Sequence, residues 1–215
     1  MDRTGSLPID DTLSKALLAE IATHGGTRNF PAHAILINEG DATDSLYIVL
    51  SGRVKVYASS EDGRDVVLGE HGPGEYFGEL SFDGGRRSVS VMALEPCSCR
   101  VVQGAQLREF LAAHPDFALH LALKLSRMVR RLTEQVKSLA LQDVYGRLVR
   151  LLMELSEPVG SERLVKQKLT QQDIAERIGS SREMVNRVLK ELTTGGYVAQ
   201  RDGRLAILRK LPAAW

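Results

Sequence analysis

Arg182, Glu183 and Arg187 are the charged residues whose spacing allows the most specific chemistry in this sequence. On a helix they lie near one outer face. Arginine can bind guanine through O6 and N7 together, and a carboxylate can accept a hydrogen bond from the N4 amino group of cytosine. Gly179 precedes them and can make a tight turn. A turn of this kind precedes the helix that enters the major groove in a helix-turn-helix. We therefore interpret this segment as a DNA-reading helix, because a merely solvated charged face would not explain the turn.

The neighbouring elements indicate a winged helix-turn-helix. Thr170 is expected to be the N-cap of a first helix, with Asp173 in the capping-box position, and Ser181 opens the second helix. Further along, Asp202-Gly203 is the turn chemistry of a tight β-hairpin. We predict helices over residues 170–178 and 181–192 and paired strands over residues 197–200 and 205–208.

A second group could bind a cyclic nucleotide: Gly78, Glu79 and Leu80, followed by Arg87 and Ser88. The carboxylate of Glu79 can accept a hydrogen bond from a ribose hydroxyl, while the guanidinium of Arg87 and backbone N–H groups can hold a phosphate. Gly78 has no Cβ, so the backbone can come close to a ligand there. The alternative is structural: Glu79 and Arg87 form a partly buried ion pair under a loop.

The segment from residue 26 to about residue 105 predicts an antiparallel β-sandwich or β-roll. Short apolar alternations are separated there by turn residues such as Glu39-Gly40-Asp41 and Gly72-Pro73-Gly74. An amphipathic helix is expected before it, over residues 10–23. We predict strands over residues 35–37, 46–50, 54–57, 66–68, 88–92 and 99–102.

A long helix is predicted from about residue 114 to residue 141, without Gly or Pro after its start. Apolar residues step along it by three and four, which indicates a heptad-like seam. A helix of this length is about 40 Å long, so it would extend past a small roll and favour a partner helix. We expect a parallel dimer, and the alternative is packing along its own domain. The seam is Leu121, Leu125, Met128, Leu132 and Leu139, with Gln135 in the remaining place.

Charge divides the chain into an acidic front and a basic back. The formal net charge of all 215 residues is only +1, but residues 1–123 carry −7 and residues 124–215 carry +8. Since Lys and Arg neutralise phosphates, the back half is expected to meet nucleic acid. The apolar runs are too short or too broken by charge for a membrane span, and residues 1–11 show no export signal, so we expect a cytoplasmic protein. Cys97 and Cys99 are interpreted as reduced thiols, buried or half-buried, on one face of a strand.

Taken together, these motifs resemble the cyclic-AMP receptor protein and fumarate-nitrate regulator (Crp/Fnr) family of bacterial transcription regulators, over nearly the whole chain. The resemblance implies that Arg182, Glu183 and Arg187 read a GTGA-type half-site. It also implies phosphate contacts from the polar residues at the two helix starts, namely Thr170, Gln172 and Ser181.

The same resemblance implies an effector pocket in which Glu79 binds ribose and Arg87 and Ser88 bind phosphate, within a cassette that includes Gly78 and Leu80. Members that respond to cyclic AMP place two adjacent hydroxyl residues of the long helix over the purine, and here these positions are Leu132 and Thr133. Leu132 cannot hydrogen-bond an adenine amino group, whereas Thr133 can. The expected effector is cyclic AMP or cyclic GMP, and no cofactor is obligatory.

The prediction is therefore an α+β protein in three parts. An antiparallel β-roll of the cyclic-nucleotide-binding type covers residues 1–113, a dimerisation helix residues 114–142, and a winged helix-turn-helix residues 143–215. Expected partners are double-stranded DNA, a second copy of the chain and, from the resemblance, RNA polymerase; no membrane, catalytic site or metal site is expected.

Two other functions remain open at this point. One is a regulator of the same fold that acts without a cyclic nucleotide or senses another ligand. The other is a cupin-type metalloenzyme, which needs two histidines and a glutamate on one metal; His33 and His71 lack a His-x-His partner for this. It would also leave the winged helix unexplained.

Overall fold

The computed structural model describes residues 12–21 and 23–212, which form two compact units. One unit holds the described residues up to Ala58 together with Leu68–Met128, and the other holds Ser59–Val67 and the described chain from Val129 onward. Helix α1 (Lys15–Ile21) lies within the helix predicted over residues 10–23. Residues 1–11, in which we see no export signal, lie outside the described part.

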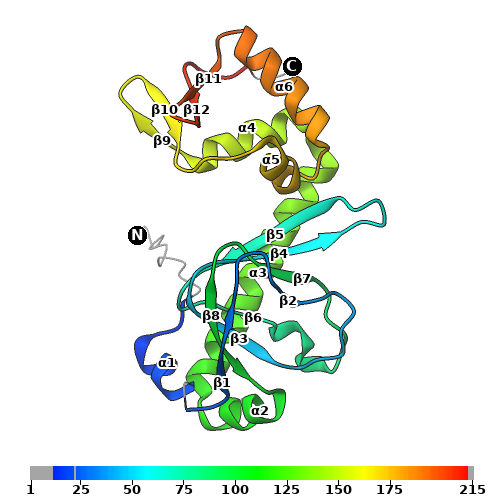
Figure 1. Cartoon of the computed structure of the whole chain (residues 1–215), viewed down its shortest axis with the longest axis vertical. Coiled ribbons are helices and arrows are strands. Elements are labelled where there is room, and N and C mark those ends of the chain that lie inside the picture. The colour runs from blue at the N-terminus through cyan, green and yellow to red at the C-terminus, as the bar shows by residue number, and fades with distance from the viewer. Residues whose placement is uncertain (1–11, 22, 213–215) are drawn as a thin grey trace, which may run out of the picture. The chain divides into compact units, whose positions relative to one another are not determined.

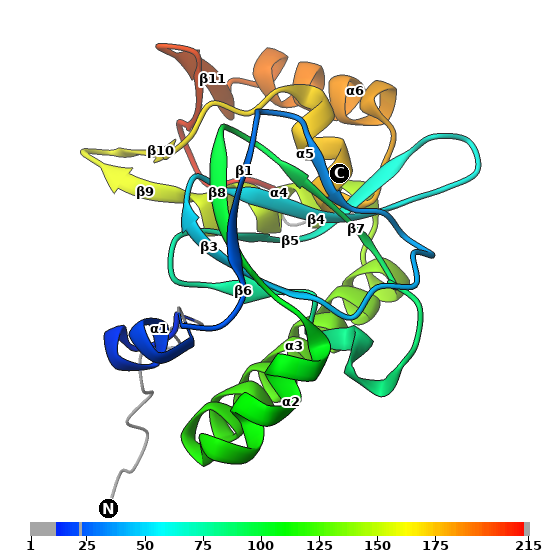
Figure 2. The same ribbon diagram turned by 60° about the horizontal axis from the view of Figure 1, so that its bottom comes forward.

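Two four-stranded sheets make up the β-roll, with strand orders β1-β8-β3-β6 and β2-β7-β4-β5. The registered pairs are antiparallel, and Figures 1 and 2 show β1, β8 and β3 side by side. The antiparallel roll predicted from the sequence is confirmed. Its strands are β1 (Gly26–Phe30), β2 (Ile35–Ile37), β3 (Leu46–Ser51), β4 (Val54–Ser59), β5 (Asp65–His71), β6 (Tyr76–Phe77), β7 (Ser90–Ala93) and β8 (Cys97–Val102).

Strand β3 is buried on both faces, which explains its continuous apolar sequence. Leu46 and Ile48 belong to a core cluster that includes residues of the helices of this unit. Tyr47 and Val49 point the other way, into a second cluster formed by residues of both sheets. The strand therefore connects the two halves of the core beside the candidate cassette.

Two helices follow the roll, α2 (Gly104–Ala113) and α3 (Pro115–Leu141). His114 ends α2 through a hydrogen bond from its N–H to Phe110 O, and Pro115 starts α3, where its missing N–H costs nothing. The first half of α3 packs into the first core cluster through Phe117 and Leu121.

The exposed stripe of α3 differs from the predicted seam. Leu121 is buried in the core of its own unit, so this place in the predicted seam is wrong, whereas Leu125 and Met128 are half-buried, Leu125 against the same core and Met128 in a cavity wall. From Val129 onward the exposed apolar row keeps Leu132 and Leu139 of the predicted seam and adds Val129 and Val136, in the three- and four-residue steps of a coiled-coil face. This α3 stripe consists of Val129, Leu132, Val136 and Leu139, with exposed fractions of 62%, 40%, 65% and 51%.

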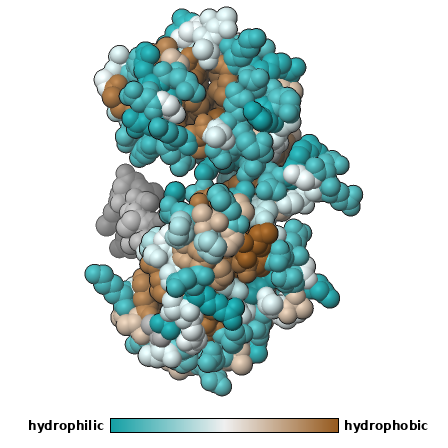
Figure 3. Space-filling view, viewed as in Figure 1, coloured by the Kyte–Doolittle hydropathy of each residue, from teal (hydrophilic) through white to brown (hydrophobic). Residues whose placement is uncertain are grey.

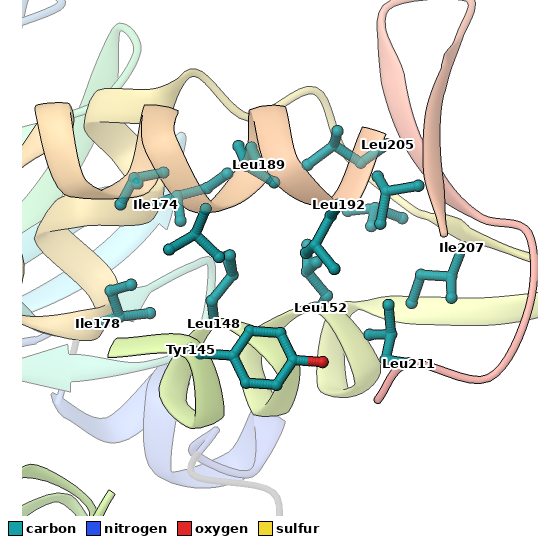
Figure 4. Close-up of a cluster of buried hydrophobic side chains, with 14 of the residues drawn as sticks. Tyr145, Leu148, Leu152, Ile174, Ile178, Leu189, Leu192, Leu205, Ile207 and Leu211 are labelled. Carbon is teal, nitrogen blue, oxygen red and sulfur yellow. The ribbon is translucent and has the colours of Figure 1, made fainter. Parts of the chain in front are cut away.

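The second unit contains the winged helix-turn-helix. Its sheet has the order β11-β12-β10-β9, and its core fills the space between the helices and this sheet (Figure 4). In the space-filling view, the visible face of this unit has an apolar centre surrounded by hydrophilic residues (Figure 3). The elements are α4 (Val144–Leu155), β9 (Ser156–Val159), β10 (Glu162–Val165), α5 (Gln171–Ile178), α6 (Arg182–Thr194), β11 (Val198–Arg201) and β12 (Arg204–Ile207).

Candidate functional site

The candidate cassette begins where β6 turns into a short 3-10 helix, η1 (Glu79–Asp83). Gly78 has a φ of 90° at this turn, and a Cβ there would lie 2.8 Å from Ser45 O and 2.9 Å from Arg87 Nη1. Only glycine fits this position. The predicted residues Gly78, Glu79, Leu80, Arg87 and Ser88 all line one cavity of about 60 Å³. Ligand pockets are usually about 300–1,000 Å³, so a nucleotide would need this cavity to open.

Arg87 is buried and its guanidinium is held by the protein. Its Nε donates to Thr43 Oγ1 at 2.8 Å, Nη1 to Gly78 O at 2.7 Å and Nη2 to Ser45 O at 2.7 Å. Burial lowers the pKa of Arg87, against the opposing effect of nearby groups such as Tyr47. The group nevertheless stays cationic, because arginine does not lose its proton in proteins. A positive charge is therefore fixed in the cavity wall.

Glu79 pairs with a residue that the sequence reasoning did not single out. Its side chain is 3% exposed, and Oε1 lies 3.1 Å from Nζ of Lys124, which is fully buried on α3. Lys124 also donates to Tyr76 O and lies over the Tyr76 ring, 3.8 Å from its centroid. A signal existed in the sequence, because Lys124 follows Phe117 and Leu121 in the apolar periodicity of the helix.

Leu132 and Thr133 lie on the exposed part of α3, in the other compact unit. Thr133 Oγ1 donates to Val129 O of its own helix at 2.9 Å. Leu132 belongs to the α3 stripe. The structure therefore groups five of the predicted effector residues around one cavity and places these two elsewhere on α3.

Helix α5 starts and ends with the predicted caps, and helix α6 starts with its predicted cap. Thr170 accepts a hydrogen bond from the Asp173 N–H, and the Asp173 carboxylate accepts one from the Thr170 N–H, which is a capping box. Gly179 ends α5 with a φ of 60°, in the left-handed region. Ser181 caps α6 by accepting from the Met184 N–H at 3.2 Å. These caps fix the turn between the two helices.

Helix α6 divides into a buried face and an exposed face. Val185, Val188, Leu189 and Leu192 are buried in the core of this unit, whereas Arg182, Glu183 and Arg187 are exposed. The Glu183 carboxylate accepts from its own backbone N–H and from Ser181, and these hydrogen bonds lower its pKa. Glu183 is therefore an ionised acceptor at neutral pH, as hydrogen bonding to cytosine N4 requires.

Polar contacts of two side chains, Gln171 and Arg147, were missed by the sequence reasoning and support this surface. Gln171 Nε2 donates to Asn186 Oδ1 at 3.1 Å, which joins the start of α5 to the exposed face of α6. Arg147 of α4 donates to the Ile178 carbonyl at 2.8 Å and also to the Gly179 carbonyl, at the end of α5. Long polar side chains of this kind have no periodic signature, so the sequence could not identify their partners.

The predicted wing hairpin is present. β11 and β12 pair from Val198 opposite Ile207 to Arg201 opposite Arg204. Asp202 and Gly203 both have positive φ, at 50° and 77°, which is the geometry of a type I′ turn. The turn therefore places Arg201 and Arg204 side by side at the tip.

Comparison with known proteins identifies both units. A family described as "Cyclic nucleotide-binding domain" matches residues 27–114, and one described as "Crp-like helix-turn-helix domain" matches residues 146–211. The cAMP-activated global transcriptional regulator CRP of Pasteurella multocida is 32% identical over 189 residues, which is 86% of this chain and 88% of that protein. The chain belongs to the CRP family.

A further relative and two solved structures extend this likeness. The CRP-like cAMP-activated global transcriptional regulator of Mycobacterium tuberculosis is 34% identical over 175 residues, covering 79% of this chain and 78% of that protein. The c-di-GMP-responsive global regulator CLP of Xanthomonas campestris has a TM-score of 0.82 at 26% identity, over 92% of this chain and 100% of that chain. A CooA mutant from Carboxydothermus hydrogenoformans, at 20% identity and a TM-score of 0.78, shares the fold.

This CRP-family protein is a DNA-binding transcription regulator with a cyclic-nucleotide-binding-type domain, as the sequence predicts. Its relatives are regulators, not cupin-type enzymes. Within residues 12–21 and 23–212, no group of three or more His, Cys, Asp or Glu side chains could hold a metal ion. In the same part of the chain, no helix is long and apolar enough to cross a membrane.

Proposed function

We propose that this regulator reads DNA with Arg182, Glu183 and Arg187. The observation that carries the proposal is the two-faced α6, whose buried row holds it in the core and leaves these three side chains exposed. The acidic acceptor and the two guanidinium groups match the donors and acceptors of a GTGA-type half-site. Loss of any one is expected to weaken discrimination at one base pair.

Thr170, Gln172 and Ser181 are proposed to position the protein on the phosphate backbone. Thr170 and Ser181 cap helix starts, where free backbone N–H groups and the helix dipole favour an anion. The exposed side chain of Gln172 hydrogen-bonds Glu176 at 3.0 Å in this structure, so it would have to turn toward the DNA. Arg201 and Arg204 add positive charge at the wing.

The effector is proposed to be a cyclic nucleotide, with cyclic AMP or cyclic GMP as the first candidates. The cavity provides the cation of Arg87 for a phosphate and the carboxylate of Glu79 for a ribose hydroxyl, beside Gly78, Leu80 and Ser88. The names of two relatives describe activation by cAMP, while CLP is c-di-GMP responsive. Cyclic di-GMP therefore belongs in the same test.

A regulator of the same fold that needs no cyclic nucleotide is the second candidate. It is favoured by one observation: Arg87 and Glu79 already have protein partners in a cavity of about 60 Å³. In that case the cassette is a structural element of the roll.

We further propose that the regulator is a homodimer joined along the α3 stripe, with Thr133 the remaining hydroxyl that could reach a purine beside Leu132. Its proposed parts are the sensor over residues 1–113, the dimerisation helix over 114–142 and the DNA-binding domain over 143–215. RNA polymerase is a proposed partner, supported by the relatives' names as global transcriptional regulators. Because the target is DNA, we place the protein in the cytoplasm.

The test is a titration of the protein into a labelled duplex with two inverted GTGA-type half-sites one helical turn apart, at fixed salt. It is repeated without nucleotide and with cyclic AMP, cyclic GMP or cyclic di-GMP. Tight binding with only one nucleotide supports the effector and names it. Tight binding in every condition supports the second candidate, whereas binding no tighter than to a scrambled duplex contradicts the proposed half-site.

A further inference from the structure

Lys124 is a fully buried charged residue in the unit that carries the cavity. Lysine is almost never fully buried in proteins unless it is paired. Here the ammonium group contacts the Glu79 carboxylate, the Tyr76 carbonyl and the face of the Tyr76 ring. These contacts hold it between α3, β6 and the first residue of η1.

The contact with Lys124 gives the Glu79 carboxylate an oppositely charged neighbour where it lies, in the protein interior. An isolated buried carboxylate is strongly unfavourable, and an opposite charge at ion-pair distance offsets much of that cost. Oε1 of Glu79 lies 3.1 Å from Nζ of Lys124, so a residue of α3 sets the orientation of the carboxylate. Glu79 also lines the cavity, while Lys124 is completely covered.

Lys124 also supplies a polar connection from α3 to the cassette. One helical turn later, Met128 gives the cavity wall an apolar contact from the same helix. Leu132 offers no hydrogen bond at all. A ligand that bonds to Glu79 therefore acts on an ion pair whose other member belongs to α3.

We infer that Lys124 is the positioning residue for Glu79 and the link through which an occupied cavity acts on α3. This inference rests on the proposed effector function of the cavity. It assigns Lys124 no direct contact with the ligand, so its whole effect on binding passes through Glu79.

The first experiment is a double-mutant cycle on nucleotide binding with the full-length protein. Calorimetric titrations of cyclic AMP, cyclic GMP and cyclic di-GMP are made with wild type, K124M, E79Q and E79Q/K124M. The methionine keeps the length of the side chain without its charge. K137M is the matched control, because Lys137 is an exposed lysine of the same helix whose ammonium group pairs with Glu134 on the helix surface.

We expect K124M to raise the Kd of the bound nucleotide about tenfold or more, which is about 1.4 kcal/mol. The variants E79Q and E79Q/K124M should have equal Kd values, and K137M should match wild type. A wild-type Kd for K124M, or an E79Q/K124M that binds more weakly than E79Q, would overturn the inference. If K124M does not fold, judged by circular dichroism, K124Q is measured in its place under the same criteria.

The second experiment measures DNA affinity with and without saturating nucleotide. In wild type the ratio of the two affinities reports the coupling between cavity and DNA. K124M should bring this ratio close to one while keeping the nucleotide-free affinity, whereas a purely structural role would leave the ratio at saturation unchanged. A wild type that binds none of the nucleotides means that the proposed effector is wrong and overturns the inference with it. If wild type binds a nucleotide and K124M has the same nucleotide Kd and the same ratio of DNA affinities, the inference is overturned while the proposed effector function stands.

Discussion

Replacement of Val136 by glutamate should dissociate the proposed dimer. Val136 lies in the middle of the α3 stripe and is 65% exposed, more than Val129, Leu132 or Leu139. In a coiled-coil seam this position faces its own copy on the partner helix. A single substitution therefore changes both sides of the interface at once.

The size of the effect follows from the exposure of the stripe. Burying a valine side chain completely contributes about 1.5–3 kcal/mol, so two half-exposed valines contribute roughly 2 kcal/mol to a dimer. Two glutamates in their place add like-charge repulsion and the desolvation of two carboxylates, at least as large again. The total is about 4 kcal/mol or more, which is about a thousandfold in the dimer Kd.

Sedimentation velocity over a range of protein concentrations measures this Kd for wild type and V136E. R130E is the matched control, because Arg130 is also exposed but lies outside the α3 stripe. We expect a dimer for wild type and R130E, and a monomer for V136E at micromolar concentration. A V136E protein that sediments as wild type does would refute the assignment of the stripe as the dimer face.

Other substitutions and reagents test the remaining parts of the structure. R182A should weaken binding to the half-site duplex about tenfold to a hundredfold and scrambled DNA much less, because a bidentate contact to guanine is base-specific; competition titrations measure both. G179A should lower the free energy of unfolding by about 1–2 kcal/mol, since Gly179 is left-handed at φ 60° and a Cβ would lie 3.1 Å from a leucine methyl group. G160A is its control in urea unfolding, because Gly160 has a φ of 61° and a Cβ there would meet no atom. An equal loss of unfolding free energy in both variants would show that the close contact at residue 179 contributes nothing. Cys97 and Cys99 should resist iodoacetamide at pH 8 in the folded protein and react in urea, because burial raises the pKa of both thiols, that of Cys99 to about 12; rapid labelling of the native protein would contradict this.

The sequence predicts the elements whose signal is local. The start and end of α5 follow from Thr170 and Gly179, because a cap or a left-handed residue depends on its immediate neighbours. Strand β2 matches its predicted bounds, and the hairpin turn at Asp202-Gly203 lies where expected. The five cassette residues around the cavity were also identified, since they are close together in the chain.

Features that depend on distant partners were missed. The hairpin of β9 and β10 was not predicted, because Pro158 and Gly160 are typical of a helix stop as well as of a turn. Strand β1 has no apolar alternation, and it is recognisable only through its pairing with β8. The predicted seam of α3 wrongly began at Leu121, which is buried in its own unit, because a three-four pattern does not say which row the roll covers. Lys124 was passed over for the same reason.

The continuity of helix α3 also limits which insertions and deletions this protein can accept. Its early turns are anchored by Lys124 and Met128, and its later turns carry the α3 stripe, with no break between them. Each residue added to an α-helix turns everything beyond it by about 100°. One inserted residue after Met128 would turn the stripe by about 100° relative to the anchored early turns, whereas seven would bring it back almost to the same direction. Insertions and deletions in this segment should therefore be tolerated in heptads and rejected singly.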